Sequence, residues 1–379
     1  MTESTAVKFP QSGGDPYCPL EFFERLRRAH VVQSLVLPNG RPAWLVSGYA
    51  LTLQMLSDRR LGRIAPDSPE SSEHRNFRLT VSRLLTPDVI DGLRSPIKSI
   101  CEFLMEAAVS NGSIDLVAGY ALPIAGTVFY ELLGVDPQDR EQITQLILAI
   151  PPEEVRREDK IDSEVALEKA RQFFTALANT RYRQPRADLI SRMTTGEDRQ
   201  NAGEISDIAL KLFVAGFEPT ANLISSSLFH LLKNPDLLLE LHQKPNLAGR
   251  VAQELARYDG PVYPGITRHV WSDIDVAGQH IRAGDLLVFP VSAAGRDAEN
   301  FEDADVLKWD RIPSHLLTFG YGPHYCLGAQ LALLALTMAI QSFAARISNS
   351  QMWVESCSEV WNDRFVRGLL RLPIVLTRT

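Results

Sequence analysis

Apolar residues recur at helical spacing along most of this chain. Patterns with a period of 3.6 residues predict helices over 117–134, 165–182, 204–233, 247–258 and 327–345. Residues 31–48 instead carry two apolar segments around a turn at 38–40, which predicts a β-hairpin. A second group of short strands is expected in 273–290, where Gly278 and Gly284 mark turns. The pattern therefore predicts a mainly α fold with a minor β-sheet region.

Composition supports one folded body. The sequence has no internal repeat and no linker rich in Pro, Gly or Ser, so a single domain over 1–379 is the simplest interpretation. With 45% hydrophobic and 22% charged residues, the chain can bury a large core. The charged segment 153–164 is interpreted as a solvated surface or loop, and the segment 181–186 as a helix end rather than a binding patch.

Net charge and hydropathy argue against two classes of partner, nucleic acids and membranes. A net charge of -7 argues against a nucleic-acid-binding chain, which needs concentrated Lys and Arg on one face. The N-terminal residues lack a basic run followed by an apolar core, and we expect no apolar run near the roughly 18 residues that a spanning helix needs. We therefore expect no membrane association and a cytoplasmic location.

The cysteines point to a different chemistry from zinc or disulfides. Cys18, Cys101, Cys326 and Cys357 lie far apart without a Cys-x-x-Cys pair, so neither a zinc cluster nor a disulfide framework is indicated. Cys326 stands in the segment 319–328, FGYGPHYCLG, directly before an apolar helix. The start of a helix favours a thiolate, and the glycines of the segment would let the backbone turn and a flat cofactor approach. The alternative is a small buried cysteine at a helix start.

This segment resembles the haem-binding loop of the cytochromes P-450, Phe-x-x-Gly-x-His/Arg-x-Cys-x-Gly, at all five fixed positions. The resemblance implies the cytochrome P-450 fold and haem b, iron protoporphyrin IX, as the cofactor. It implies that the thiolate of Cys326 is the metal ligand and favours O–O cleavage. By the same resemblance His324 would contact a haem propionate, Phe319 would shield the sulfur, and Gly328 would belong to the cofactor site.

Other segments resemble the family in the expected order. Glu254 and Arg257 are similar to the family's structural Glu-x-x-Arg pair, and their i, i+3 spacing places them on one helix face. Arg268, in a segment that continues to Asp273 and Gly278, is similar to the arginine that binds a haem propionate. Taken alone, a Glu-x-x-Arg is usually a surface pair of little energetic worth, and the alternative for Arg268 is an ordinary exposed cation.

A further pair lies in the first quarter of the chain. His74 and Arg78 resemble the His-x-x-x-Arg of the helix that lies against the haem edge, and their i, i+4 spacing suits two carboxylates. The segments 15–27 and 131–141 are also similar to the family. The expected fold thus does not depend on the cysteine segment alone.

The chain departs from the family where oxygen is activated. Residues 215–220 read AGFEPT, whereas the family usually reads Ala-Gly-x-Glu/Asp-Thr. The acid, Glu218, is present, but Pro219 supplies neither the hydroxyl nor the N–H of the usual threonine. Thr220 is turned by about 100° on a helix and is no simple substitute. Glu218, Pro219 and Thr220 are the candidate catalytic positions, with protons coming from Glu218, water or a substrate hydroxyl.

Several reactions remain compatible with Pro219. It can be a tolerated change in an ordinary hydroxylase. It can also accompany peroxide use, or a one-electron oxidation that leads to ring closure or aryl coupling. A peroxide-driven haem enzyme, and a haem sensor or carrier without turnover, are therefore kept as alternatives to a monooxygenase.

Further differences concern the surroundings of the site. The segment 61–74 is short where the family often has a longer loop over the substrate, so we expect an open pocket for a bulky or carrier-protein-bound molecule. Val306 stands where a polar residue often supports the Glu-x-x-Arg pair, which predicts a network of two members. Candidate pocket residues, all apolar, are Phe213, Ala215, Phe217, Pro264, Ile266 and Phe365.

The sequence therefore predicts a haem-thiolate monooxygenase or oxidase. Its expected substrate is a small-molecule intermediate of secondary metabolism, with dioxygen as oxidant and electrons from a ferredoxin-type partner. Lys308, Arg311 and His315 are expected to give a mildly basic surface for an acidic partner of this kind.

Overall fold

The computed structural model describes most of the chain. The described residues are 7–8, 27–28, 31–37, 40–64, 72–150, 160–195, 199–262, 265–311, 314–347, 352–354, 359–361 and 367–378. They group into two compact units, of which the first, the sheet unit, comprises Met1–Asn76 and Gln253–Cys326. The second, the helical unit, comprises Phe77–Ala252 and Leu327–Thr379. The interpretation as a single domain stays a prediction.

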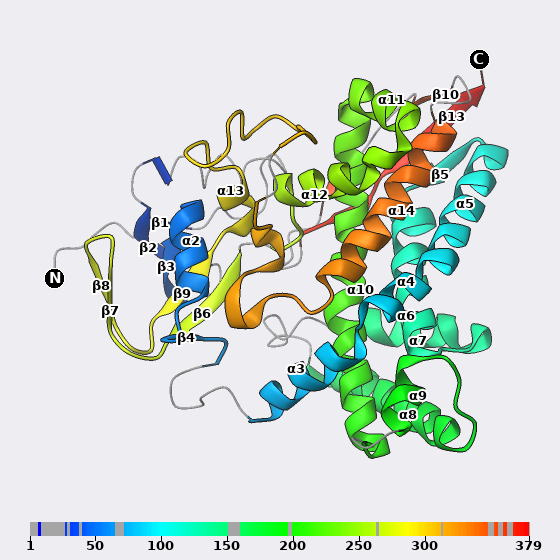
Figure 1. Cartoon of the computed structure of the whole chain (residues 1–379), viewed down its shortest axis with the longest axis horizontal. Coiled ribbons are helices and arrows are strands. Elements are labelled where there is room, and N and C mark those ends of the chain that lie inside the picture. The colour runs from blue at the N-terminus through cyan, green and yellow to red at the C-terminus, as the bar shows by residue number, and fades with distance from the viewer. Residues whose placement is uncertain are drawn as a thin grey trace. The chain divides into compact units, whose positions relative to one another are not determined.

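The sheet unit is built on one mixed sheet. Its strands lie in the order β1 (Val7–Lys8), β2 (Val32–Val36), β3 (Pro42–Val46), β9 (Leu286–Phe289), β6 (Ile266–Val270) and β4 (Leu61–Gly62), and β2, β3, β9 and β6 can be followed side by side in Figure 1. The pairs β1–β2 and β3–β9 are parallel, and the other neighbours are antiparallel. The predicted hairpin is confirmed, because Val32 pairs with Val46 and Gly40 adopts a φ of 78°.

The second predicted strand group is also confirmed. β7 (Ile274–Val276) and β8 (Gln279–Ile281) form a hairpin, and Gly278 in its turn has a φ of 77°. The remaining short elements of this unit are α2 (Tyr49–Leu56), α13 (Val291–Gly295), η4 (Leu317–Phe319) and η5 (Gly322–His324). Apolar side chains of β3, β6 and β9 form a buried core with those of α2 and α13.

The helical unit contains most of the α-helices. They and their short helical turns are α4 (Pro87–Gly92), α5 (Arg94–Asn111), η1 (Val117–Ala121), α6 (Leu122–Leu133), η2 (Pro137–Asp139), α7 (Arg140–Leu148), α8 (Lys160–Arg183), α9 (Leu189–Thr194), α10 (Ala202–Lys233), α11 (Pro235–Gln243), η3 (Pro245–Leu247) and α14 (Ala329–Ile347). Small antiparallel sheets pair β10 (Met352–Val354) with β13 (Pro373–Arg378) and β5 (Ser113–Asp115), and β11 (Val360–Trp361) with β12 (Leu369–Arg371). α3 (Ser72–Leu84) and α12 (Ala248–Tyr258) each begin in one unit and end in the other.

The five predicted helices are confirmed, which gives a mainly α fold with minor sheets. The helix predicted over 117–134 begins with a π-helical turn, η1, before α6. The segment 181–186 is a helix end, as predicted, because α8 ends at Arg183. Of the charged segment 153–164, residues 153–159 lie outside the described residues and the remainder starts α8.

α10 is the long helix that carries the segment AGFEPT. Asn201 caps its first turn by accepting hydrogen bonds of 3.0 Å from the N–H groups of Gly203 and Glu204, and the Glu204 carboxylate accepts from the Asn201 N–H. The helix continues through Pro219 to Lys233. In Figure 1 it runs beside α14, with which it is in contact. Because the helix is continuous here, the side chains of residues 215–220 point in successive directions around its axis.

The apolar helix α14 corrects one prediction. Its window Ala329–Arg346 has the 18 residues and the apolar composition that a membrane span needs, so the expectation that no apolar run approaches this length is wrong. Some 61% of the window is buried, and α14 packs against α5, α10 and α11 of the same unit. Within the described residues it is a core helix.

Candidate active site

The cysteine segment forms a tight loop in the sheet unit. Gly320 and Gly322 both have a φ of 71°, a conformation that residues with a Cβ rarely adopt. The backbone N–H of Cys326 donates a hydrogen bond of 2.9 Å to the carbonyl of Phe319, whose side chain is buried. The side chain of Cys326 is exposed. The loop therefore closes on itself and presents the thiol to its surroundings.

The second described cysteine offers a contrast. Cys101 lies on α5 and is fully buried, and this burial raises the pKa of its thiol to about 12. Burial therefore disfavours the thiolate form that a metal ligand needs. Cys18 and Cys357 lie outside the described residues. Of the cysteines that the structure describes, Cys326 alone combines exposure with a position near the start of a helix.

Two of the predicted cofactor contacts come together in the sheet unit. The rings of His74, near the start of α3, and His324, in the cysteine loop, have centroids 6.0 Å apart. Arg268 lies on β6, and only 5% of its surface is exposed. Its guanidinium donates a hydrogen bond of 2.7 Å to the carbonyl of Thr267. Arg78 follows His74 by one turn of α3, as predicted.

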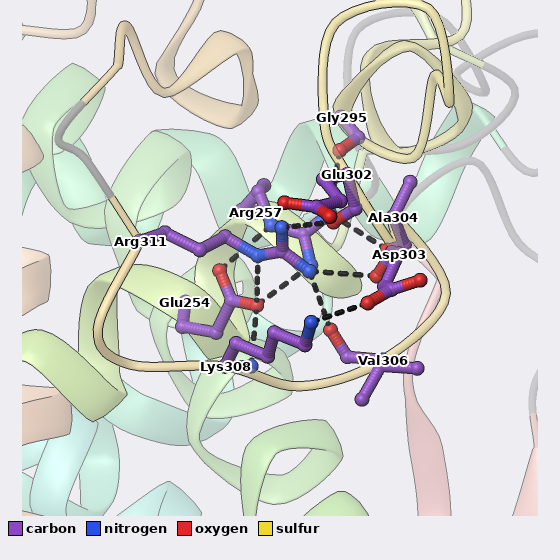
Figure 2. Close-up of polar contacts among 9 residues, drawn as sticks. All are labelled: Glu254, Arg257, Gly295, Glu302, Asp303, Ala304, Val306, Lys308 and Arg311. Atoms are coloured by element: carbon purple, nitrogen blue, oxygen red, sulfur yellow. Dashed lines mark hydrogen bonds and ion pairs between the residues drawn. The ribbon is translucent and has the colours of Figure 1, made fainter.

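The pair Glu254–Arg257 is the centre of a buried ionic network (Figure 2). Arg257 donates two hydrogen bonds of 2.7 Å to the Glu254 carboxylate and two more to the carbonyls of Gly295 and Ala304. Arg311 adds a third side chain, with its Nε 2.9 Å from the same carboxylate. The prediction of a two-member network is therefore wrong.

Arg311, which the sequence predicts on a basic surface, is instead the third member of this network. The side chain of Val306 is exposed, but its carbonyl accepts a hydrogen bond of 2.8 Å from Arg311. The carbonyl of Asp303 accepts another, of 2.7 Å, from the same guanidinium (Figure 2). Burial alone would raise the pKa of Glu254, yet its hydrogen bonds from both arginines and a backbone N–H lower it overall. Glu254 is therefore held as a carboxylate.

The same contacts correct the prediction of a basic surface. Arg311 is largely buried against Glu254, and Lys308 forms an ion pair with Asp303. That ion pair raises the pKa of Lys308 and lowers that of Asp303. His315 is exposed, but its ring packs on Tyr321 with centroids 4.8 Å apart. Lys308 and Arg311 are thus neutralised within the sheet unit.

α10 separates the three candidate catalytic residues by face. Glu218 and Pro219 are half-buried, whereas Thr220 is buried with 7% exposure. The role of Thr220 stays a prediction. One turn earlier, Gly216 lies close to α6, since a Cβ there would come within 2.3 Å of the Phe129 ring. A side chain at position 216 would therefore displace the Phe129 ring.

The candidate pocket residues lie in different environments. Phe213 and Phe217 are buried in an aromatic cluster of the helical unit, where Phe213 stacks on Phe129 with centroids 5.2 Å apart, and their assignment to the pocket stays a prediction. Ala215 is exposed on α10. Ile266 is half-buried and packs on the core of the sheet unit. Pro264, Phe365 and residues 65–71 of the segment 61–74 lie outside the described residues.

The described residues fit an iron porphyrin. An exposed thiol suits a soft metal, and the histidines and arginine of the sheet unit suit two propionates. In the helical unit, a Cβ added to Gly328 would meet no protein atom within 4 Å, so space remains beside the backbone there. These features come from separate elements and agree on one kind of cofactor.

Comparison with known proteins decides the family. The family model described as Cytochrome P450 matches residues 153–355. The chain belongs to the cytochrome P450 family. A "Biotin biosynthesis cytochrome P450" of Bacillus subtilis is 30% identical over 87% of this chain and 89% of its own length. The "Mycinamicin IV hydroxylase/epoxidase" of Micromonospora griseorubida is 30% identical over 93% and 94%.

A solved structure agrees with this assignment. The crystal structure of P450BioI with an acyl carrier protein that bears hexadec-9Z-enoic acid has a TM-score of 0.85. It is 27% identical, over 96% of this chain and 99% of its own. This cytochrome P450 therefore has the family fold, belongs to a class of monooxygenases, and uses haem with a thiolate ligand.

Proposed function

We propose that this cytochrome P450 oxidises an intermediate of secondary metabolism, by hydroxylation or by oxidative ring closure or coupling. The hydroxylase/epoxidase of mycinamicin IV, similar over nearly the whole chain, supports this substrate class. The P450BioI complex supports the idea of a substrate attached to a carrier protein. The short segment 61–74, which leaves little chain to cover a pocket, is compatible with such a bulky molecule.

The observation that carries the proposal is the exposed thiol of Cys326 in its closed loop. Cys326 would hold the iron, Phe319 would shield the sulfur, and Gly328 would leave room for the ring. His74, Arg78, Arg268 and His324 would bind the propionates. When bound, the haem would activate dioxygen, so that one oxygen atom enters the substrate and the other leaves as water with two protons and two electrons.

The chain itself must deliver those protons and admit the electrons. Glu218 is the proposed acid on α10, and Pro219 cannot donate a proton or a hydrogen bond. A ferredoxin-type protein is the proposed electron donor, and a cytoplasmic location goes with this partner. Because Lys308 and Arg311 are engaged internally, other cations would have to attract it.

The replacement of the usual threonine by Pro219 also favours a second candidate function, use of hydrogen peroxide. Peroxide already carries both electrons and both protons, so an incomplete proton route would matter less. The two functions differ in a simple assay. Turnover sustained by peroxide alone, and unchanged by ferredoxin and its reductase, would support the second function over the first.

The spectrum of the reduced carbon monoxide complex tests the haem-thiolate assignment. The purified protein should show the long-wavelength Soret band of thiolate ligation, and Cys326→Ser should abolish it. Cys101→Ala is the matched control, because Cys101 is buried on α5 and should leave the band in place. A band that survives Cys326→Ser, or no band in the native protein, would refute the proposal.

A further inference from the structure

Asn222 lies on the same side of α10 as Pro219. The two positions are three residues apart, so their Cβ atoms are neighbours on the helix surface. Helical side chains also lean toward the N-terminus and cover the preceding turn. The amide of Asn222 is therefore the next polar group after Pro219 on that side. The family's usual hydroxyl is missing from the same place.

The environment of this amide indicates a bound water molecule. Asn222 is 6% exposed, and its Nδ2 has no hydrogen-bond partner among the described residues. A buried amide N–H without a partner is unfavourable, and buried water commonly satisfies such groups. The donor thus points to a water as its natural partner.

Gly368 fixes the position of the amide within the helical unit. A Cβ on Gly368 would lie 2.1 Å from Cγ of Asn222, 2.2 Å from Oδ1 and 2.5 Å from Nδ2. The backbone just before β12 therefore lies against the amide so closely that a Cβ there would displace it. This contact leaves the Asn222 side chain little freedom to turn away from its observed position.

Pro219 supplies the other half of the site. Since proline has no N–H, the carbonyl of Ala215 has no donor four residues further along α10. A water in this gap can donate to that carbonyl and accept from Nδ2 of Asn222, which gives it partners on two sides. The site thus offers one donor and one acceptor beside the half-buried Glu218.

We propose that Asn222 is a positioning residue that holds a water beside Pro219, and that this water passes on the protons which the family's threonine would otherwise deliver. The inference rests on the proposed monooxygenase function. The protons come from solvent, and the water regains each one it gives up, so no further reactant is needed. When this water is lost, the two electrons from the donor leave with two protons as hydrogen peroxide instead of product water.

A crystal structure and a coupling measurement test the proposal together. High-resolution structures of the haem-loaded enzyme should show a water within hydrogen-bond distance of Nδ2, and Asn222→Leu should remove it. The product formed per electron pair should fall about fivefold in Asn222→Leu, as expected for one lost hydrogen bond. Ser226→Ala is the matched control, because Ser226 is buried on the same side and donates only to the Leu223 carbonyl.

A second substitution separates positioning from a structural role. Pro219→Thr restores a hydroxyl, so adding it to Asn222→Leu should recover most of the lost coupling. No water at Nδ2, unchanged coupling in Asn222→Leu, or a loss that Pro219→Thr does not recover would each overturn the inference. Coupling is compared only among variants that keep the thiolate Soret band. If the native protein lacks this band, the proposed function is refuted rather than the role of Asn222.

The contact with Gly368 provides a check that does not depend on turnover. Gly368→Ala should lower the thermal midpoint in the native background, because the new methyl group overlaps the amide. In an Asn222→Ala background the same change should lower it much less. Equal effects in both backgrounds would contradict the placement of the amide against Gly368.

Discussion

Removal of the carboxylate at the centre of the ionic network should destabilise the sheet unit severely. Glu254→Ala deletes the acceptor of two hydrogen bonds from Arg257, one from Arg311 and one from the backbone N–H of Lys308, all 2.7–2.9 Å long. Arg257 is 4% exposed, so its charge would stay buried with only carbonyl partners. Breaking a buried ion pair on one side costs about 3–5 kcal/mol, a large share of a typical stability of about 5–15 kcal/mol.

Urea denaturation followed by circular dichroism measures this loss against a matched control. Lys308→Met removes an ion pair with Asp303 whose partners are exposed, so it should cost at most about 1 kcal/mol. Glu254→Gln should also be destabilised at neutral pH. Because the folded-state pKa of Glu254 is lowered, its contribution is complete above the ordinary carboxyl pKa and disappears as the pH falls through the folded value. If Glu254→Ala costs no more than Lys308→Met, the network does not stabilise the fold.

Three further changes test other parts of the structure. After haem removal, a maleimide at pH 8 should label Cys326 but not the buried Cys101, whose pKa of about 12 keeps its thiol protonated. With haem bound, Cys326 should also be protected. Peptide mass mapping measures the labelling of both cysteines. Arg181→Met should lower the free energy of unfolding in urea by about 3–5 kcal/mol. Arg181 is fully buried against Asp188, and its removal leaves that buried carboxylate without its ion-pair partner. Gly134→Ala should cost about 1–3 kcal/mol in the same assay, since φ is 73° and the new Cβ would lie 2.2 Å from Asp188.

The long helices and the hairpin could be predicted because their signals are local. The apolar spacing over 204–233 matches α10 within two residues of its start, and the hydrogen bond from the Gly40 N–H to the Leu37 carbonyl closes the hairpin of β2 and β3. The π-helical turn at 117–121 was not predicted, since its apolar residues have the same pattern as an ordinary helix. Periodicity gives the extent of a helix but not its internal hydrogen-bond pattern.

In the candidate site, too, local features could be predicted and long-range contacts could not. The cysteine loop could be predicted because its ligand and its glycines lie within ten residues. Arg311 could not be assigned to Glu254, because the two residues are 57 positions apart and the strands and turns between them set their distance. The burial of Phe213 and Phe217 could not be predicted, because α10 is apolar on several faces and the packing of Phe129 on Phe213 depends on a distant helix.

The ionic network and the cysteine loop are connected through α12. The hydroxyl of Thr318 donates to the carbonyl of Ala256, which lies between Glu254 and Arg257 on that helix. Phe319, the next residue, accepts the hydrogen bond from the N–H of the cysteine. A change that loosens α12 thus acts on the carbonyl that closes the loop. We therefore expect Glu254→Ala to release haem faster than Lys308→Met, since only the first change weakens the helix to which Thr318 donates.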